Sequence, residues 1–388
     1  MKNAHHFEAP PKVLLVGPSL AGGGAQNRFR RVAENLFGGK TGIAAFETHG
    51  MESFQPYLPS LHLGWSGKLS YPIMVARLRQ FLNRHSFDAV FAFGFYPIVV
   101  SWAAVQWLRK RPALILTEIT SPRRESLAMQ GAIRRPIIES LRRMIYRRGD
   151  LYAANSEDGV SDALRYYGVD PKLARRLPNV IDKERLQLLA ASGERPEQSD
   201  DVLSVCIAAR LSREKRVDTL LKAAAALPSD LAWEIDIVGD GPDRAALEAE
   251  SRSLGVSARV YFHGWLQNPY PIIARACLLV LCSENEGFSN SVLEAMVLRT
   301  PVITSLCTSD AREICARGAA LGFAVGDPLE LRARLEQALT SKKLRSELSE
   351  NGWRFAQRHT TPSALLDYEA LVRDAIGQKQ RKQPSRPL

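Results

Sequence analysis

Short apolar runs alternate with amphipathic stretches along the first half of the chain. Each run is followed by polar residues or glycine, which predicts a buried strand of a parallel sheet. After the first run, Phe29, Val32 and Leu36 recur at helical spacing and predict a helix. Repeated alternation of strand and helix predicts a doubly wound α/β sheet. The predicted strands of this half are residues 13–16, 89–93, 114–117 and 151–154.

The same alternation restarts after a break in composition. Residues 190–201 include Ser192, Gly193 and Pro196, which indicates a linker. A chain of 388 residues is long enough for two domains. We therefore expect two sheets of one type that face each other across a hinge. The predicted strands of the second half are residues 202–208, 234–238, 260–262, 277–282 and 301–304, with helices at 217–227 and around Glu294.

Two glutamates follow the predicted strand 277–282. Glu286 is expected on the loop, and Glu294, near the start of the next helix, is expected to point back toward the same crevice. Ligands of parallel sheets bind outside the carboxyl ends of the strands. Two carboxylates suit a ligand with hydroxyls at both ends, such as a nucleotide-activated sugar. The alternative is that Ser291 and Glu294 form a capping box and Glu286 is a solvated loop charge.

Cations and glycines follow two other predicted strands. Arg210 and Lys215 lie after strand 202–208, where they could offset the two charges of a diphosphate. Gly239 and Gly241 form a tight turn after strand 234–238, where a nucleobase or ribose could approach the backbone. A solvated basic loop and an ordinary structural turn are the alternatives.

A glycine-rich turn precedes the helix that contains Phe29. Backbone N–H groups at Gly23 and Gly24 could approach a phosphate or a developing oxyanion. The turn is not a P-loop, because no Lys-Ser or Lys-Thr follows it. It is not the dinucleotide fingerprint either, because Asn27 occupies the place of the last glycine. A purely structural turn is the alternative.

The positive charge of the chain lies in its first half. Residues 1–199 contain 28 lysines and arginines against 17 aspartates and glutamates, whereas residues 200–388 contain 24 of each. Arginines alternate with apolar residues between Ile133 and Tyr146, which indicates a basic amphipathic helix. Such a helix can lie on an anionic membrane with its apolar face buried, or can pack on the sheet with its arginines solvated. Nucleic acid is not the expected partner, because no binding module or interleaved exposed aromatics accompany the charge.

The remaining composition indicates a cytoplasmic protein. Five cysteines without close pairs favour buried thiols over a zinc site, and the first residues lack the apolar segment of a signal peptide. Residues 89–108 carry no charge over a length that could span a bilayer, but Gly94 and Pro97 interrupt them. One strand followed by one helix explains this stretch better. The basic, polar residues 378–388 are predicted to form a disordered tail.

The order and spacing of several segments resemble retaining glycosyltransferase family 4, which has two facing Rossmann-like domains with a cleft between them (the glycosyltransferase B, or GT-B, fold). In the second half these are residues 209–221, 238–242, 262–270, 286–296 and 301–304 with 312–314; looser likenesses are residues 22–26, 156–158 and 177–182. The resemblance implies an acceptor-binding domain at 1–190, a linker at 191–201 and a nucleotide-sugar domain at 202–360. It also implies a C-terminal helix, residues 361–377, that crosses back to the first domain.

The resemblance implies a role for each candidate residue. Arg210 and Lys215 would neutralise the leaving diphosphate, Glu286 would hold sugar hydroxyls and Glu294 would hold the ribose hydroxyls. Electrostatic stabilisation of the leaving group is then the main catalytic effect. Backbone groups would complete the donor site: the amides of Gly287, Phe288 and Ser289, the turn of Gly239 and Gly241, and, from the facing domain, Gly23 and Gly24.

No metal and no cofactor are expected. The sequence contains no Asp-x-Asp pair, which is the usual metal-binding element of metal-dependent sugar transferases. Arg210 and Lys215 would stand in for the metal ion. In retaining enzymes of this family the donor phosphate is thought to accept the proton of the acceptor, so a dedicated base is not required.

The sequence also departs from the family pattern. Ala209 replaces the usual glycine before Arg210, and residues 298–301 lack the glycine that often ends the Glu294 helix. The first half lacks the histidine that many relatives have, and Glu118 occupies about that place. Glu118 is therefore the candidate for acceptor contact. A buried strand-end carboxylate paired with Arg123 or Arg124 is the alternative.

These observations lead to an expected function. We expect a retaining glycosyltransferase that moves a hexose or N-acetylhexosamine from a UDP-sugar to a lipid-linked, polyprenyl-linked or growing glycan acceptor. It would act in surface polysaccharide synthesis, at the inner face of the cytoplasmic membrane. A nucleotide-sugar epimerase of the same architecture and a non-catalytic membrane scaffold are the alternatives.

Overall fold

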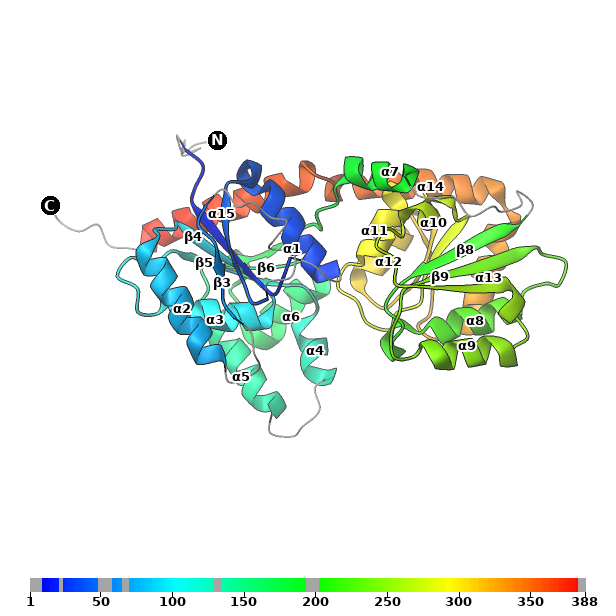
Figure 1. Cartoon of the computed structure of the whole chain (residues 1–388), viewed down its shortest axis with the longest axis horizontal. Coiled ribbons are helices and arrows are strands. Elements are labelled where there is room, and N and C mark those ends of the chain that lie inside the picture. The colour runs from blue at the N-terminus through cyan, green and yellow to red at the C-terminus, as the bar shows by residue number, and fades with distance from the viewer. Residues whose placement is uncertain are drawn as a thin grey trace. The chain divides into compact units, whose positions relative to one another are not determined.

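The computed structural model describes residues 9–20, 24–47, 58–64, 70–128, 134–192 and 202–382. The chain forms two compact units: unit 1 contains Met1–Val180 with Pro362–Leu388, and unit 2 contains Ile181–Thr361 (Figure 1). The boundary predicted at residue 190 is therefore ten residues too late, because helix α7 (Lys183–Ala191) belongs to unit 2 and buries Leu186 there. The polar break in composition marks the end of α7. Residues 193–201 of the predicted linker lie outside the described residues.

Unit 1 is built on a parallel sheet of seven strands in the order β3-β2-β1-β4-β5-β6-β7. The order reverses between β1 and β4, as in a doubly wound fold. The four predicted strands are present, and three further strands were missed. The strands are β1 (Val13–Gly17), β2 (Thr41–Ala45), β3 (Leu61–His62), β4 (Ala89–Phe93), β5 (Ala113–Glu118), β6 (Leu151–Ala154) and β7 (Ala174–Arg176).

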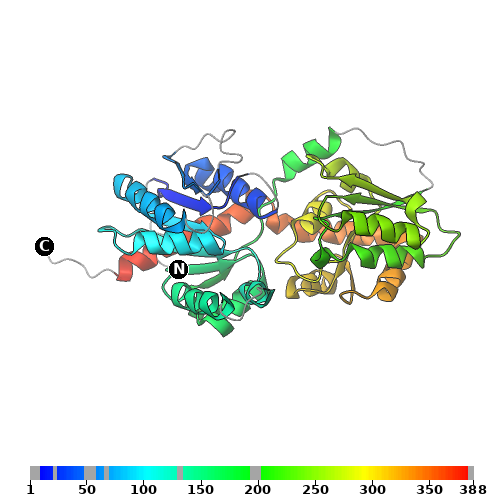
Figure 2. The ribbon, with the colours of Figure 1, turned by 60° about the horizontal axis from the view of Figure 1, so that its bottom comes forward.

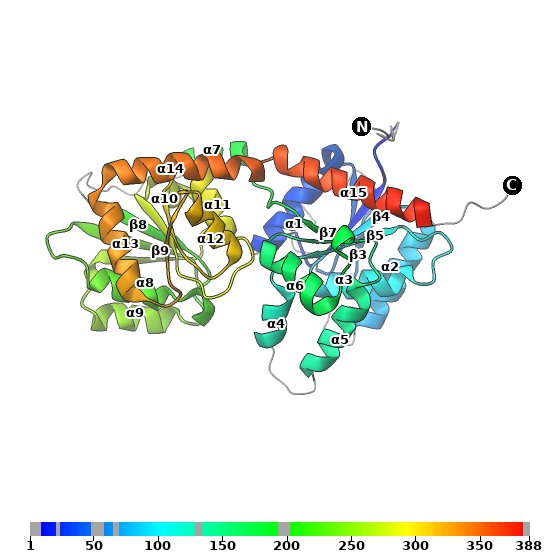
Figure 3. The same cartoon turned by 180° about the vertical axis from the view of Figure 1, so that it is seen from behind.

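Helices cover both faces of this sheet (Figure 3). One core lies under α1 (Gly24–Asn35), the 3₁₀ turn η1 (Leu36–Gly39) and α15 (Ser363–Lys382). The other core lies under α2, α3, α5 and α6. The helices between β3 and β7 in the sequence are α2 (Tyr71–Arg84), α3 (Phe95–Val105), α4 (Pro122–Ala128), α5 (Arg134–Tyr146), α6 (Glu157–Tyr167) and the 3₁₀ turn η3 (Pro171–Leu173).

Unit 2 is built on a second parallel sheet, whose six strands follow the order β10-β9-β8-β11-β12-β13. Here the order reverses between β8 and β11. The prediction of two doubly wound parallel sheets is confirmed. The strands are β8 (Leu203–Ala208), β9 (Trp233–Val238), β10 (Val260–Gly264), β11 (Leu278–Leu281), β12 (Val302–Ser305) and β13 (Leu321–Phe323).

The helices of unit 2 also form two layers (Figure 2). One core lies under α8 (Val217–Ala225), α9 (Arg244–Ser253) and α13 (Pro328–Thr340). The opposite core lies under α7 and four other helices. These are α10 (Tyr270–Arg275), α11 (Asn290–Val297), α12 (Ser309–Ala316) and α14 (Lys342–Ala356); the short 3₁₀ turns are η4 (Arg213–Lys215), η5 (Ser257–Arg259) and η6 (Gln357–His359).

The last helix of the chain belongs to the first unit. In α15 the Tyr368 hydroxyl donates to the carbonyl of Pro178 at 2.9 Å and accepts a bond from Arg28 Nε of α1 at the same distance. The helix continues to Lys382, so the disordered tail predicted from residue 378 is wrong for residues 378–382. The helix extends this far because Ala375 and Ile376 are buried in the core. Beyond them, Nζ of Lys379 lies 3.9 Å from Oδ2 of Asp150.

The uncharged stretch 89–108 forms β4 and α3, as the sequence predicts for one strand and one helix. Among the described residues, none of the helices combines the length and the apolar composition needed to cross a membrane.

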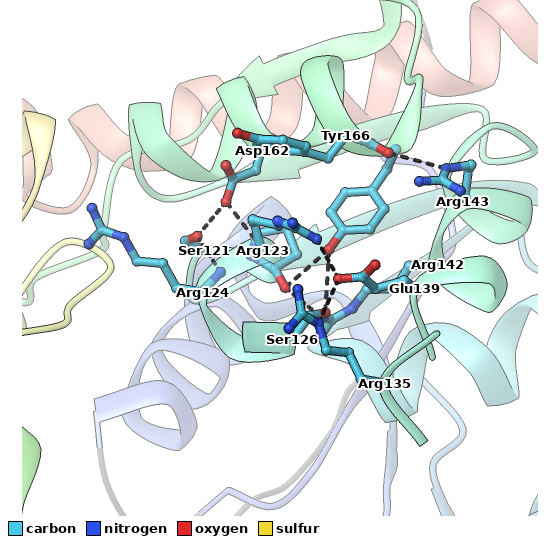
Figure 4. A network of polar contacts seen from close by, with 12 residues as sticks. Ser121, Arg123, Arg124, Ser126, Arg135, Glu139, Arg142, Arg143, Asp162 and Tyr166 are labelled. Atoms are coloured by element: carbon cyan, nitrogen blue, oxygen red, sulfur yellow. Dashed lines mark hydrogen bonds and ion pairs between the residues drawn. The ribbon is translucent and has the colours of Figure 1, made fainter. Parts of the chain in front are cut away.

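A buried polar network connects β5 with α4 and α5; part of it is drawn in Figure 4. Arg142 of α5 is fully buried, donates to Glu125 and to the Pro122 carbonyl, and lies 4.0 Å from Glu118. The Tyr146 hydroxyl also donates to Glu118, which is 2% exposed. Burial raises the pKa of Glu118 to about 7, although the Arg142 charge acts in the opposite direction.

The apolar face of α5 packs against protein. Ile145 is fully buried, and Leu141 and Met144 pack against the same core. Of the two alternatives for this helix, an apolar face buried in a membrane is therefore wrong for these residues, and packing on the sheet describes them. Helix α5 exposes Ile137, at 60%, and the side chains of Arg134 and Arg143.

We expect the Glu118→Gln variant to lose part of the pH dependence of stability. The folded state holds the Glu118 proton more tightly than the unfolded chain, so the stabilising contribution of the protonated carboxyl is complete below about pH 4.5 and is lost as the pH rises toward 7. Urea unfolding between these pH values should therefore show a smaller decline for the variant than for the wild type. Glu157→Gln, at an exposed position of α6, is the control. Parallel declines in all three proteins would contradict the prediction.

Candidate active site

Two loops meet at the carboxyl ends of β8 and β11, where the strand order of unit 2 reverses. Lys215, in η4 after β8, lies with its Nζ 2.6 Å from Oε1 of Glu286, on the loop after β11. Ser283 donates to the same carboxylate oxygen at 2.7 Å, and the backbone N–H of Glu284 donates to the Glu214 carbonyl at 2.9 Å. The structure therefore brings Lys215 and Glu286 together, as predicted for one ligand site. Their side chains are 21% and 16% exposed, so both remain accessible.

Arg210 lies on the same loop as Lys215 and is exposed. The loop is held by its own hydrogen bonds: Ser212 N–H donates to the Arg210 carbonyl, and Lys215 N–H donates to the Ser212 carbonyl. The pKa of Glu214 is lowered, mainly by a hydrogen bond from the Ser212 hydroxyl and further by the charges of Lys215 and Arg210. The loop thus presents Arg210 and Lys215 beside one carboxylate whose pKa their charges help to lower.

Gly239 and Gly241 allow a neighbouring loop to approach. A Cβ atom on Gly239 would lie 1.9 Å from the Ala209 carbonyl oxygen, and one on Gly241 would lie 2.2 Å from that of Leu211. Gly239 also has a φ of 134°, which side chains rarely adopt. Both glycines are therefore required by backbone packing, which agrees with the alternative of a structural turn. Their turn supports the loop that carries Arg210.

Glu294 is the fifth residue of α11 and accepts a hydrogen bond from the Tyr270 hydroxyl at 3.3 Å. The residue that precedes the helix is Ser289, and no side chain caps this helix end. Ser291 is inside the helix, so the capping-box alternative is wrong.

The loop 286–289 lies between these glutamates and is anchored by an aromatic stack. The buried Phe288 ring lies 4.8 Å from the His359 ring and 6.2 Å from the Phe355 ring, nearly parallel to the latter. The side chain of Phe288 thus holds the loop and leaves its backbone as the part that can meet a ligand. Gly287 and Ser289 line a pocket whose other lining residues include Glu286 and Asp310.

The candidates of the first half lie in unit 1. Gly23 lies outside the described residues, and Gly24 is the first residue of α1. Glu118 is enclosed by Arg142 and Tyr146, so it does not fit the expected contact with an acceptor. The alternative of a buried strand-end carboxylate describes it better, with a different partner: Arg123 pairs with Glu139 and Arg124 with Asp158.

Sequence reasoning missed several residues of this site. Ser283 could have been found from the sequence, because it is the polar residue directly after the apolar run 277–282. Tyr270 lies inside the segment 262–270, which resembles the family. Asp310 had only a weak signal, a polar residue after a predicted strand. Among the described residues, no three histidine, cysteine or acidic side chains are grouped so that they could hold a metal ion.

Comparison with known proteins identifies the family. Residues 192–355 match the family model described as "Glycosyl transferases group 1", and residues 39–185 match "Glycosyltransferase Family 4". The chain is 26% identical, over 63% of its own length and 65% of the relative, to the N-acetylgalactosamine-N,N'-diacetylbacillosaminyl-diphospho-undecaprenol 4-alpha-N-acetylgalactosaminyltransferase of Campylobacter jejuni. It is 31% identical, over 42% of its length and 45% of the relative, to the lipopolysaccharide core biosynthesis glycosyltransferase LpsE of Rhizobium meliloti. The chain thus spans less than two thirds of these relatives.

A solved structure shares the fold. The structure of Anabaena Alr3699/HepE in complex with UDP matches with a TM-score of 0.75 and 19% identity, over 96% of this chain and all of that one. At this identity the likeness shows the fold alone. With one family model on each half and two doubly wound parallel sheets, the chain belongs to the family 4 glycosyltransferases of GT-B fold.

Proposed function

We propose that the protein is a retaining glycosyltransferase that moves a hexose or N-acetylhexosamine from a UDP-sugar to a lipid-linked or growing glycan acceptor in surface polysaccharide synthesis. The observation that carries the proposal is the contact of Lys215 with Glu286, beside the loop that presents Arg210. One cation and one carboxylate at 2.6 Å fit a ligand in which a phosphate adjoins a sugar with hydroxyls. The names of the relatives support the reaction class.

The proposed donor site uses charge and backbone groups together. Lys215 and Arg210 bind the diphosphate and stabilise the charge that develops on it as it leaves. The start of α11, with the amides of the loop 286–289 (the donor loop), orients the phosphate and the sugar, because free N–H groups at a helix start favour anions. Glu286 accepts from sugar hydroxyls, and Glu294, held by Tyr270, accepts from the ribose.

The proposed reaction needs neither a metal nor a separate base. The bond from the anomeric carbon to the diphosphate oxygen breaks, and the acceptor oxygen bonds to that carbon on the same face of the ring. The acceptor proton passes to the leaving diphosphate oxygen. The two cations take the part that a divalent ion has in other sugar transferases.

The name of one relative and the charge of one helix support the proposed acceptor and location. The Campylobacter relative is named for a diphospho-undecaprenol substrate, which favours an acceptor carried by a membrane lipid. Helix α5 and the turn after it expose Arg134, Arg143 and Arg147, which would attract an anionic surface. We propose a peripheral protein on the inner face of the cytoplasmic membrane, held by charge and by Ile137 and not by the whole apolar face of α5.

We expect Lys215→Ala and Glu286→Ala to lower kcat by about 10²–10³-fold, because each removes a group that contacts the donor in the transition state. Turnover is measured with a UDP-sugar and a lipid-linked glycan acceptor. Melting temperatures should fall by no more than a few degrees, because each variant leaves one charge unpaired but that charge is still partly exposed and neither side chain belongs to the core. Lys343→Ala and Glu347→Ala, on the exposed face of α14, are the matched controls.

Near-wild-type turnover of the Lys215 and Glu286 variants would contradict the proposed roles. Conversion of the UDP-sugar without any acceptor would instead indicate the epimerase. Vesicle binding without any response to UDP would indicate the scaffold.

The choice of nucleotide is tested by thermal shift. Ligand that binds the native state raises the melting temperature, so UDP and UDP-sugars should raise it, and GDP and ADP should have little effect. Stabilisation by GDP but not by UDP would contradict the proposed donor.

The membrane contact is tested with the triple variant Arg134→Gln, Arg143→Gln and Arg147→Gln. Its binding to vesicles that contain anionic lipid should be about a hundredfold weaker, because each arginine near such a surface contributes about 1 kcal/mol. Added salt should weaken wild-type binding in the same direction.

A control variant removes the same charge from unit 2: Arg252→Gln, Arg259→Gln and Arg354→Gln, all at exposed positions. Equal loss of vesicle binding in both triple variants would mean that net charge alone attracts the protein to the membrane. Unchanged binding of the Arg134, Arg143 and Arg147 variant would show that the α5 surface is not the membrane contact.

A further inference from the structure

Helices α2 and α3 of unit 1 each begin with a tyrosine, and the two rings stack. Tyr71 is the first residue of α2 and Tyr96 is the second of α3, with ring centroids 5.7 Å apart and ring planes 25° from parallel. Helix α3 follows β4 directly, and the order of this sheet reverses between β1 and β4. Ligands of such sheets bind outside the carboxyl ends of the strands at this point. The tyrosine pair therefore lies where a ligand of unit 1 is expected.

The chain turns sharply after β4, so that one aromatic side chain is buried and the next is exposed. Gly94 has a φ of 88°, which favours glycine, and its N–H donates to the Thr117 carbonyl at 2.7 Å. Phe95 is buried, and its ring centroid lies 4.4 Å from the guanidinium carbon of Arg142. Tyr96 is 38% exposed. Phe95 thus anchors the start of α3, and Tyr96 presents part of its side chain to the surroundings.

A cation lies near the tyrosine pair. Burial raises the pKa of Tyr71 to about 12 and the neighbouring Tyr96 acts in the same direction, whereas the charge of Arg134, at the start of α5, lowers it. Arg134 is therefore within electrostatic range of the pair, and its side chain is exposed. The adjacent Arg135 pairs with Glu139, but Arg134 has no ion pair within the part of the chain that the structure describes. Its guanidinium is available to an anionic group of a ligand.

Two exposed isoleucines lie on the same helix starts. Ile73, in the first turn of α2, is 55% exposed, and Ile137, about one turn after Arg134 in α5, is 60% exposed. Large apolar side chains in water gain free energy when a hydrocarbon chain covers them. An aromatic ring, an unpaired cation and exposed apolar side chains together match a ligand that combines a sugar, a phosphate group and a lipid.

We propose that the sugar of the acceptor packs on Tyr96, which Tyr71 supports from behind, and that Arg134 binds a diphosphate that links this sugar to an isoprenoid lipid. The proposal rests on the proposed function and deepens it, because it assigns residues to the acceptor. The C–H groups on one face of a sugar ring pack on an aromatic side chain, and a guanidinium donates paired hydrogen bonds to phosphate oxygens. Ile73 and Ile137 then contact the first isoprene units.

Soluble acceptor analogues test the proposal with the full-length protein and without a membrane. The probes are glucose, galactose and N-acetylglucosamine, each linked to farnesol through a diphosphate, and the same three sugars linked to farnesol directly. Titration calorimetry measures their affinities. Wild-type protein should bind at least one diphosphate probe about tenfold more tightly than its counterpart without diphosphate, because charge-assisted hydrogen bonds to phosphate are strong. The Arg134→Gln variant should lose most of this difference.

The ring of Tyr96 is tested with the same pairs of probes. Tyr96→Ala should weaken the binding of both members of a pair about tenfold, because the ring packs on the sugar that they share. Tyr96→Phe keeps the ring and should keep the wild-type affinity. Tyr166→Ala and Arg165→Gln are the matched controls, because both residues are exposed on α6, and these variants should bind all probes as the wild type does. Every variant should bind UDP with unchanged affinity.

The outcomes separate this proposal from the proposed function. Wild-type protein that binds UDP but none of the probes, or that binds both members of each pair equally, would overturn the acceptor assignment alone. Full affinity of folded Tyr96→Ala for the probes would overturn the role of Tyr96. Weaker vesicle binding by Tyr96→Ala with unchanged probe affinity would assign Tyr96 to the membrane contact instead. Absence of any UDP binding would overturn the proposed function itself.

Discussion

The ion pair of Lys215 and Glu286 is the contact on which the candidate site depends. It joins the loops after β8 and β11, the two strands at which the sheet order reverses, and Ser283 donates a hydrogen bond to the carboxylate. Both charges are mostly withdrawn from water, so each needs the other while no ligand is bound. The same two groups are the ones that a phosphate and a sugar hydroxyl would contact. The empty site is thus held in place by the side chains that would meet its ligand.

The loops around this pair are positioned by contacts that do not involve a ligand. Gly239 and Gly241 let the turn after β9 lie directly against the carbonyls of Ala209 and Leu211, so the Arg210 loop has a rigid support. Phe288 holds the donor loop through its stack with Phe355 and His359. Binding groups on fixed elements keep their geometry, which is what electrostatic stabilisation of a leaving group requires.

Sequence patterns revealed the parts of the fold in which apolar side chains cluster. Strands β1, β4, β5 and β11 each contain a continuous apolar run, but Ile43 is the one large apolar residue of β2, so this strand carries little signal. The spacing of Glu286 and Glu294 was visible, whereas Asp310 reaches the same region only through packing of α12. The interpretation of α5 failed because an amphipathic pattern does not say what covers the apolar face. Likewise, the chain gave no sign that Glu118 would pair with Arg142, 24 residues away in the sequence.

Helix α15 has a consequence for how the protein is made. Its residues Ala364, Tyr368 and Val372 are fully buried with β1 and β4, so the interior of unit 1 is completed by a segment that is synthesised only after the whole of unit 2. Unit 2 is contiguous and can close earlier. Unit 1 therefore finishes folding after unit 2, and a truncation that removes α15 would damage the unit whose synthesis began first.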